Sequence, residues 1–408
     1  MARQIVAGVD IGTATTKVII AEKVFVNGMA VPKIIGMGTS ESRGVSRGYI
    51  TNTADAARSV QAATAKAEKS AGIKIKRVYA SVGGVGLGGV SAAGSTVTSR
   101  ADLEITERDI GLALEAAEAA IPSSISQNKK IINTVPVEYK IDGKEVWGEA
   151  QGLKGQKLEV KALFITCFEH HLSNLISTIE SAGIEVADVV AAPVAASFVT
   201  LSKKQKKVGC LLADIGAETT SLVVYENNNP ASLEVFPVGG VDITNDIALG
   251  LKIPLEDAEN VKLDVDRRIM YSKKKLEDII SERLKEIFGL VEKHLRNIGR
   301  DGLLPGGSII TGGSAAASGT KLASEHVLKL PTQLSEIHFG PPSELGRAGN
   351  GAENKIKDRS WAIAVGLVVV GLNADDEQSS LGIRNKALAE NGKRLVKNFR
   401  RWFSQFLP

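Results

Sequence analysis

The chain contains 408 residues, of which 43% are hydrophobic and 24% are charged, and its formal net charge is +4. This composition is typical of a globular protein with at least two domains, and it excludes a disordered or fibrous chain. The net charge is too small to indicate nucleic acid, and we expect no nucleic-acid partner.

Three further features bear on the cellular compartment of the protein and on insertion into a membrane. Cys167 and Cys210 lie inside apolar runs, which favours a reducing compartment without disulfides. Arg3 and Gln4 lead directly into a predicted strand, so the N-terminus does not resemble a signal peptide. The best apolar run, residues 361–372, is shorter than the ~18 residues expected of a transmembrane helix.

The first predicted element is a β-hairpin whose turn lies within residues 9–17, V-D-I-G-T-A-T-T-K. An apolar run precedes this stretch and another follows it, which is the pattern of two strands joined by a tight turn. Such a turn exposes backbone N–H groups and hydroxyls that suit phosphate oxygens, and Lys17 is placed to reach phosphate charge. Asp-x-Gly-Thr is also ordinary turn chemistry, so one copy alone is ambiguous.

After the first hairpin, the chain continues with a helix and a strand, and its composition then changes. We predict a helix over residues 53–71 that ends at Gly72, and a strand over 77–82. From Gly83 onward, glycine, serine and short alternating runs predict an inserted α+β subdomain over 83–161. It includes a helix with Thr106 as N-cap and Asp109 in a variant capping box, and a hairpin at residues 141–143.

Residues 160–207 again show the pattern of alternating strands and helices. The pattern predicts strands over 160–167 and 186–190 and helices over 170–181 and 193–201. The adjacent His170 and His171 have no nearby metal-ligand spacing and favour a helix-start role. The lysine-rich run 203–207 is interpreted as a solvated linker.

A second copy of the first turn follows at residues 213–221, A-D-I-G-A-E-T-T-S. Aligning Asp10 with Asp214 gives five identities within seven positions. The repeat indicates a duplicated protein whose two hairpins clasp a nucleotide. Asp10 and Asp214 would then face one Mg²⁺, which needs only one or two carboxylates besides water and phosphate.

The remainder of the second half is predicted to be helical and then to return to a strand. Residues 242–300 carry apolar positions at helical spacing, which predicts a helical subdomain. A buried strand over 308–311 runs into Gly312 and Gly313, which allow close approach of a ligand's ring or sugar, although tight packing alone would also favour them.

The C-terminal tail has a separate pattern. Residues 373–390 are polar and predict a flexible linker. In the segment 391–408, the large apolar side chains and the basic side chains gather on opposite sides of a helix, which is typical of an interfacial membrane helix. The residues expected to contact anionic lipid are Arg394, Leu395, Lys397, Phe399, Arg400, Arg401, Trp402, Phe403 and Phe406. Docking of this helix on the protein's own body or in a partner's groove is the alternative.

These residues resemble the actin, Hsp70 and sugar-kinase superfamily, and more narrowly the FtsA family of bacterial cell-division proteins. The two turns match the phosphate-1 and phosphate-2 motifs, and I-I-T-G-G-S from residue 309 matches the adenosine motif. Residues 132–143 and 152–160 look like the FtsA-specific inserted subdomain. The resemblance implies an actin-like (ribonuclease H-like) duplicated two-domain ATPase fold with an inserted α+β subdomain and a C-terminal amphipathic helix.

The resemblance also implies ligands, partners and a location. The implied ligands are ATP and Mg²⁺, and the implied partners are the FtsZ C-terminal peptide, other copies of the chain, anionic lipids and other divisome proteins. The implied location is the cytoplasmic face of the cell membrane at the division site. The nucleotide-binding residues implied are Gly12, Thr13, Thr15, Lys17, Gly216, Thr219, Gly240, Glu259, Lys262, Gly312 and Gly313, with Asp10 and Asp214 at the metal. Arg283 is the candidate contact for an acidic peptide, although a surface ion pair would explain it equally.

Two departures from the family pattern affect the expected chemistry. Ala217 and Glu218 stand where the family usually has glycines, so we expect a bulky acid near the phosphates. Ala192 stands where active superfamily ATPases place a Gln or Glu that orients the attacking water, so we expect nucleotide binding with slow or negligible hydrolysis.

The sequence predicts six regions. The first core comprises residues 1–82 and 162–203, and the insertion occupies 83–161. The second core comprises 204–238 and 303–372, with the helical subdomain at 239–302. The linker spans 373–390 and the tail helix 391–408. Two alternatives remain at this point, a small-molecule kinase of the same superfamily and a type IV pilus assembly protein of the PilM kind.

Overall fold

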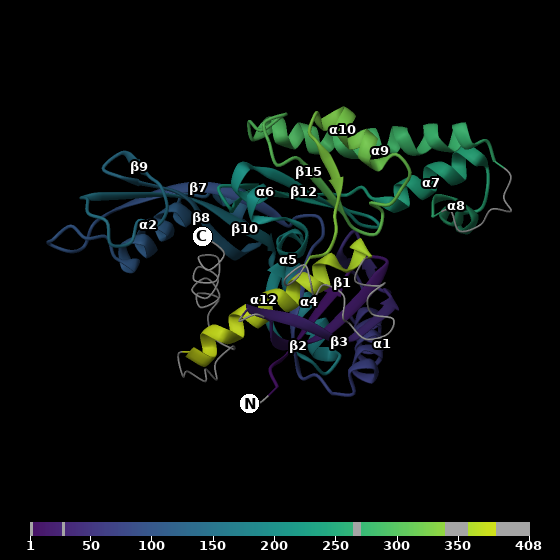
Figure 1. Ribbon diagram of the computed structural model, residues 1–408, viewed down its shortest axis with the longest axis horizontal. Coiled ribbons are helices and arrows are strands. Elements are labelled where there is room, and N and C mark those ends of the chain that lie inside the picture. The colour runs from purple at the N-terminus through teal and green to yellow at the C-terminus, as the bar shows by residue number, and fades with distance from the viewer. Residues whose placement is uncertain (1–2, 27–28, 264–270, 339–357, 381–408) are drawn as a thin grey trace.

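The computed structural model describes residues 3–26, 29–263, 271–338 and 358–380 (Figure 1). The tail helix predicted for 391–408, with all its membrane-contacting residues, lies outside this part of the chain, as do residues 381–390 of the predicted linker. Within the described residues, no helix is long and apolar enough to cross a membrane.

The first half of the molecule is built on a five-stranded sheet of order β11-β6-β1-β2-β3. The hairpin of β1 (Ile5–Ile11) and β2 (Thr15–Val26) pairs with β3 (Met29–Glu41) on one side. On the other side, β1 pairs in parallel with β6 (Arg77–Val82), which pairs in parallel with β11 (Glu185–Ala191). Helix α1 (Thr53–Ala71) lies across β2 and β3 and also packs on α4 (Glu169–Ser181).

The second half repeats this topology in a sheet of order β14-β13-β12-β15-β16. An antiparallel meander of β12 (Cys210–Ile215), β13 (Thr220–Glu226) and β14 (Asn229–Phe236) is extended by parallel strands β15 (Ser308–Thr311) and β16 (Thr332–Leu334). Each sheet therefore has three antiparallel strands followed by two parallel ones. The predicted actin-like duplicated α/β fold is confirmed.

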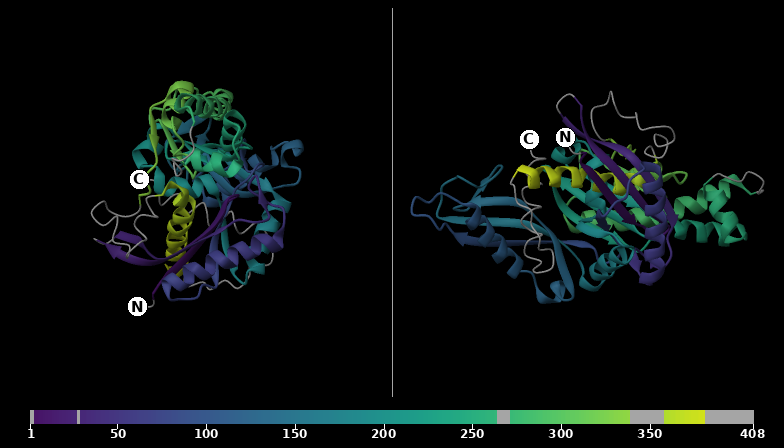
Figure 2. Two further views of the ribbon diagram at one scale, coloured as in Figure 1. Left: turned by 90° about the vertical axis from the view of Figure 1, so that its right-hand side faces the viewer. Right: turned by 90° about the horizontal axis from the view of Figure 1, so that it is seen from below.

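Two subdomains project at opposite ends of the long axis (Figures 1 and 2). The helical one contains α7 (Gly240–Leu251), α8 (Leu255–Lys262) and α9 (Lys273–Asn297). Helix α10 (Thr320–Leu328), between β15 and β16 in the chain, packs on α9 and β16. The inserted one has a sheet of order β7-β10-β8-β9, from β7 (Gly88–Val97), β8 (Lys129–Ile141), β9 (Lys144–Val146) and β10 (Lys157–Phe168). Helices α2 (Glu107–Ala119) and α3 (Ser123–Ser126) lie between β7 and β8 in the chain. The insertion has its own hydrophobic core, as an α+β unit should.

The two halves share a continuous core, which includes α5 (Ala192–Thr200) and α12 (Ala362–Ser380). The contact between these helices is close, because a Cβ on Gly366 of α12 would stand 1.9 Å from the Ala195 carbonyl oxygen. Helix α12 also packs on β1, β2 and β6 of the first sheet. In packing it belongs with the first half, although the sequence division placed 303–372 in the second.

Two boundary predictions are wrong. The lysine run 203–207 is not a solvated linker but helix α6 (Lys203–Val208), whose capping box is formed by Ser202 and Gln205. Lys206 lies over the rings of Phe198 and Tyr225, and burial lowers its pKa to about 8. The linker predicted from residue 373 also begins too early, because α12 continues to Ser380. In both segments the polar composition indicated exposure to solvent and was interpreted as a linker. An exposed segment can nevertheless form the hydrogen bonds of a helix.

Candidate functional site

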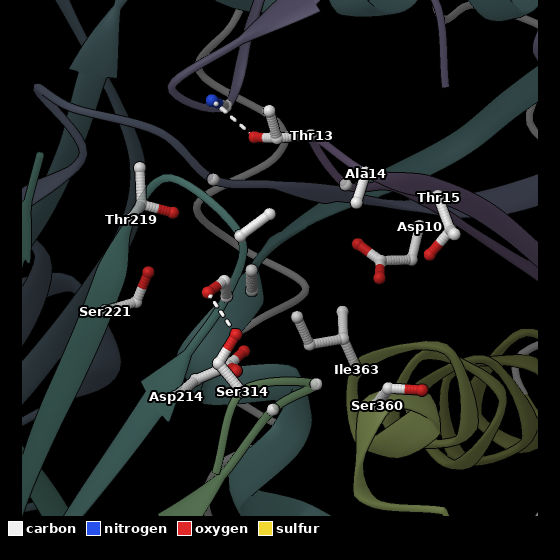
Figure 3. A pocket seen from close by; sticks show the side chains of 18 of the residues that line it. Asp10, Thr13, Ala14, Thr15, Asp214, Thr219, Ser221, Ser314, Ser360 and Ile363 are labelled. Atoms are coloured by element: carbon white, nitrogen blue, oxygen red, sulfur yellow. Dashed lines mark hydrogen bonds between the residues drawn. The ribbon is translucent and has the colours of Figure 1, made fainter. Parts of the chain in front are cut away.

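A cleft of about 540 Å³ lies between the two halves, and both predicted turns line it (Figure 3). The turn between β1 and β2 contributes Gly12, Thr13 and Thr15, and the turn between β12 and β13 contributes Gly216 and Thr219. A further side is closed by Ser360, in the turn before α12, and by Ile363, in the first turn of α12. The duplicated topology thus brings the two equivalent turns to one cavity.

The turns have the same local geometry. In the first, Asp10 pairs with Lys17 across the hairpin, and the N–H of Gly12 donates to the Thr15 carbonyl at 3.2 Å. In the second, Asp214 pairs with Ser221, and the N–H of Gly216 donates to the Thr219 carbonyl at 2.8 Å. Each aspartate therefore ends a buried strand next to a glycine turn.

Lys17 lies close enough to the two aspartates to lower the pKa of both. Lys17 Nζ donates to Thr15 Oγ1 at 2.9 Å and lies 5.9 Å from the centroid of the Trp361 ring. The carboxylate of Asp10 is buried and accepts a hydrogen bond from Ser81 Oγ at 2.7 Å. Figure 3 shows the Asp10 and Asp214 side chains directed into the same cleft.

Both carboxyl groups are held away from their ordinary ionisation. Burial raises the pKa of Asp10, against the opposing effects of Lys17 and the Ser81 hydrogen bond. Burial also raises the pKa of Asp214, to about 7, and the charge of Asp10 adds to this while Lys17 opposes it. Two neighbouring carboxyl groups with raised pKa values, of which Asp10 is buried and Asp214 is half-buried, therefore favour a positive charge in addition to that of Lys17.

The donor set fits Mg²⁺ in a particular way. Among the described residues, no group of three or more His, Cys, Asp or Glu side chains could hold a metal by itself. Asp10 and Asp214 are two hard oxygen donors, so a magnesium ion here would complete its octahedron with water and phosphate oxygens, the mode typical of nucleotide sites. These are the residues that could hold the metal.

Glycines are required where backbone approaches the cleft. Gly312 follows β15 with a φ of 97°, and a Cβ there would stand 2.2 Å from Asp214 Oδ1. A Cβ on Gly240 would stand 1.9 Å from Ser314 Oγ. Gly240 is not among the residues lining the cleft, but its carbonyl accepts a hydrogen bond from Lys262 Nζ at 3.0 Å. Gly312 and Gly313 both line the cavity.

Glu259 and Lys262 both line the cleft and contact each other. Lys262 Nζ lies 2.7 Å from Glu259 Oε2 and donates to Thr244 Oγ1 at 2.9 Å. The side chain of Lys262 is only 6% exposed, whereas that of Glu259 is 43% exposed. The Lys262 side chain is thus buried and held by its contacts, while Glu259 keeps a face toward solvent.

The expectation for Glu218 is wrong. Its side chain does not line the cleft; Glu218 Oε2 instead accepts hydrogen bonds from the N–H of Arg47 at 2.5 Å and from Ser46 Oγ at 3.1 Å. The sequence could not indicate this, because the two partners lie about 170 residues away and reach Glu218 only in the folded molecule. Ala217 and Ala192 do line the cleft.

Several residues that line the cleft were not predicted. Ser81 ends β6, beside β1, and the rule that functional groups gather at the carboxyl ends of parallel strands would have found it. Asp358, Arg359 and Ser360 form the start of a 3-10 turn (Arg359–Trp361) that leads into α12. Asp358 before the apolar run is an N-cap signal. The Nε of Arg359 is buried without a hydrogen-bond partner among the described residues.

Arg283 lies in the helical subdomain and is engaged within the chain. Its guanidinium makes two hydrogen bonds to Asp246, at 2.6 and 2.9 Å, and one to Glu286 at 2.7 Å. Of the two explanations for Arg283, an acidic peptide contact and a surface ion pair, the described residues show the ion pair.

Solved structures support the class of protein that this fold and cleft define, an actin-like protein. The chain is similar to a chain in a PilM-PilN type IV pilus biogenesis complex, with a TM-score of 0.64, 18% identity, and coverage of 90% of this chain and 98% of that one. It is also similar to MreB5 of Spiroplasma citri bound to ADP, with a TM-score of 0.52, 11% identity, and coverage of 93% and 98%.

Sequence comparisons narrow this class. The family model "Cell division protein FtsA" matches residues 211–366, and "SHS2 domain inserted in FTSA" matches 89–166. Proteins described as cell division protein FtsA match from Pseudomonas aeruginosa, with 26% identity over 98% of this chain and 97% of the relative, and from Bacillus subtilis, with 28% over 90% and 83%. The FtsA of Borreliella burgdorferi shares 29% identity over 90% and 91%. The chain belongs to the FtsA family of cell division proteins.

Proposed function

We propose that this chain is an ATP-binding, polymerising protein that tethers the FtsZ ring to the inner face of the cytoplasmic membrane during cell division. The single observation that carries the proposal is the pair of equivalent turns with Asp10, Asp214 and Lys17 at one cleft, in a chain of the FtsA family. MreB5, which shares the fold, is described as bound to ADP in one structure and to AMPPNP in another.

The nucleotide would lie with its phosphates between the two turns. The N–H groups and hydroxyls of these turns, together with Lys17, would hold the phosphates, and Asp10 and Asp214 would hold Mg²⁺. The metal would supply neutralisation of phosphate charge. Gly312 and Gly313 would allow the adenosine to approach the backbone, with Glu259 and Lys262 near the ribose and adenine.

Hydrolysis of the bound ATP is proposed to be slow. Ala192 begins α5 and faces the cleft with a methyl group, which cannot orient an attacking water. A steady-state turnover of several ATP per second by the purified full-length protein would contradict this.

The membrane and partner assignments rest on the family and on the tail sequence. The tail would attach filaments to anionic lipid, and the helical subdomain would receive the FtsZ C-terminal peptide, with other divisome proteins as further partners. For Arg283 to contact an acidic peptide, a peptide carboxylate would have to replace Glu286, whose side chain is 59% exposed.

The alternatives are less well supported. A small-molecule kinase would require a catalytic Asp facing a substrate. Asp10 and Asp214 are placed where a metal would be held, and Asp358, which also lines the cleft, accepts hydrogen bonds from the N–H and the hydroxyl of Ser360. A pilus assembly role shares the fold, but the similarity to the PilM-PilN structure is at 18% identity and supports the fold alone.

The test is electron microscopy of the full-length protein on anionic lipid monolayers, with and without Mg·ATP and FtsZ. We expect filaments that need ATP and that recruit FtsZ to the lipid. The variant Lys17→Ala should lose the ATP response, while Lys66→Ala, a change of equal charge on α1, should keep it. Dispersed protein under every condition would contradict the proposal, and phosphorylation of a soluble acceptor would favour the kinase.

A further inference from the structure

A tight turn from the first half of the molecule contacts both turns that line the cleft. Strands β4 (Val45–Ser46) and β5 (Tyr49–Ile50) are joined by Arg47 and Gly48, whose φ angles are 48° and 77°. Two successive positive φ angles are the geometry of a type I′ hairpin turn, which fixes the direction of both central N–H groups. We refer to residues 45–50 as the bridging hairpin.

The bridging hairpin is held firmly to the first half. The N–H of Gly48 donates to Thr13 Oγ1 at 3.1 Å, directly in the first turn of the cleft. The N–H of Val85 donates to the Arg47 carbonyl at 3.4 Å. A Cβ on Gly48 would stand 2.4 Å from the Cα of Gly84, so the two backbones are in direct contact. The hairpin therefore moves with the first half.

Glu218 joins this hairpin to the second half. Its carboxylate accepts from the Arg47 N–H and from Ser46 Oγ, at 2.5 and 3.1 Å. The backbone at Glu218 is itself fixed, because the N–H groups of Gly240 and Val241 at the start of α7 donate to the carbonyls of Gly216 and Ala217. The bridging hairpin of the first half and the second turn of the cleft are thus connected by the Glu218 side chain, beside the cleft.

We propose that Glu218 is a latch that holds the phosphate end of the cleft closed and slows the release of a bound nucleoside triphosphate. This inference rests on the proposed nucleotide binding. A glycine at this position could not reach Ser46 or Arg47, so the contact depends on the acid in this chain. Because the carboxylate accepts two hydrogen bonds outside the cleft, its charge is directed away from the phosphate position.

The first experiment measures the dissociation rate of a fluorescent ATP analogue from the full-length protein by stopped flow. Glu218→Ala removes the acceptor and should raise this rate about fivefold. Ser46→Ala removes one donor and should have a smaller effect. The double variant should release the analogue no faster than Glu218→Ala alone, because both substitutions break the same contact.

Two control variants and a melting-temperature measurement separate the latch from other effects. Glu180→Ala makes the same charge change at an exposed position on α4 and should leave the dissociation rate unchanged. Arg47→Asn should also leave it unchanged, because the contact uses the backbone N–H and Asn tolerates a positive φ. A lower melting temperature for Glu218→Ala with an unchanged dissociation rate would show a merely structural role and overturn the proposal.

A second measurement does not depend on nucleotide. Hydrogen exchange of the segment 45–50 in the nucleotide-free protein should be faster in Glu218→Ala than in the wild type, because the Arg47 N–H loses its acceptor. If the wild-type protein binds no nucleotide, the proposed function fails, and the exchange rate still tests the contact. Equal exchange in both proteins would overturn the latch.

Discussion

At the residue scale, the cleft depends on positions where a single added carbon would collide with a functional group. Gly312 is the sharpest case, since its φ of 97° is in the left-handed region and its missing Cβ leaves room for Asp214 Oδ1. Gly319 has a similar φ of 80°, yet a Cβ there meets nothing within 4 Å. Substitution of Gly319 therefore tests backbone strain alone, whereas substitution of Gly312 adds a steric clash to the strain.

We expect Gly312→Ala to abolish binding of a fluorescent ATP analogue, because the new methyl group displaces Asp214. Gly319→Ala should lose about 1 kcal/mol of unfolding free energy from backbone strain and keep its nucleotide affinity. Fluorescence titration and denaturant unfolding of both variants make the comparison. Equal nucleotide affinities in the two variants would contradict the assignment of Gly312 to the cleft.

A second residue-scale prediction concerns Asp109 in the inserted subdomain. Burial would raise the pKa of Asp109, but hydrogen bonds from Thr106 and Ser99 outweigh this and lower the pKa to about 2. A carboxyl group whose pKa is lower in the folded state stabilises above its unfolded pKa, and this stabilisation is lost as the pH falls from about 4 through about 2.

Asp109→Asn should therefore reduce the unfolding free energy by about 2 kcal/mol at pH 7, with a smaller difference at pH 3. Urea unfolding at the two pH values measures this. Glu107→Gln, an exposed change in the same helical turn, should alter stability by only a few tenths of a kcal/mol. A pH-independent difference for Asp109→Asn would contradict the hydrogen-bonded carboxylate as the cause.

The residues of the cleft that sequence could indicate are those in the repeated turns. Asp10 and Asp214 stand in a motif whose two copies reinforce each other, so local pattern was sufficient. Ser81 and Arg359 come from segments without a repeated motif, and they reach the cleft only through the strand order and the placement of α12. Glu218 was assigned the wrong surroundings for the same reason.

At the element scale, the contact between α5 and α12 links the shared core of the two halves. Gly366 permits it, because a side chain there would overlap the Ala195 carbonyl. Gly289 is also a helical glycine, in α9, but a Cβ on it meets nothing within 4 Å. Replacement by alanine should therefore have opposite effects at the two sites.

We expect Gly366→Ala to lose about 2 kcal/mol of unfolding free energy through overpacking, despite the better helix propensity of alanine. Gly289→Ala should gain up to about 1 kcal/mol. Chemical denaturation of both variants gives the two values. Stabilisation by Gly366→Ala would show that the two helices are not in the close contact described.

Elements with strong local signals could be predicted closely, and those defined by tertiary partners could not. Helix α1 and strands β6 and β15 have the predicted bounds, because an N-cap, a C-cap glycine or a glycine pair marks their ends. Helix α6 was missed because a run of lysines indicated solvent, whereas Lys206 packs against two aromatic rings. The sequence likewise could not indicate which half of the molecule α12 packs against, because its apolar run is almost uniform and marks no face as exposed.

At the scale of the whole molecule, duplication determines the architecture. The identical strand order of the two sheets places equivalent turns at one cleft, and the insertion and the helical subdomain extend away from it at opposite ends. The repeat in sequence was sufficient to predict the duplication and the cleft between the two turns. The repeat could not predict the contact between Glu218 and the bridging hairpin. This contact joins the two halves, and neither half contains an equivalent of it.

The last prediction concerns attachment to membranes through the tail. Deleting residues 393–408 should abolish co-sedimentation of the protein with anionic vesicles. Each basic residue near anionic lipid contributes about 1 kcal/mol, and the large apolar side chains add partial burial. Replacing Arg394, Lys397, Arg400 and Arg401 with glutamine should weaken binding most at low salt, because only the electrostatic part is screened.

Nucleotide should strengthen this attachment if the protein polymerises. One tail binds reversibly, whereas a filament presents many tails at high effective concentration, so Mg·ATP should increase the co-sedimented fraction of the wild type. The same addition should leave the truncated protein in the supernatant. Unchanged co-sedimentation of the truncated protein would place the lipid contact elsewhere in the chain. An equal fraction of wild type with and without Mg·ATP would separate membrane binding from nucleotide-dependent assembly.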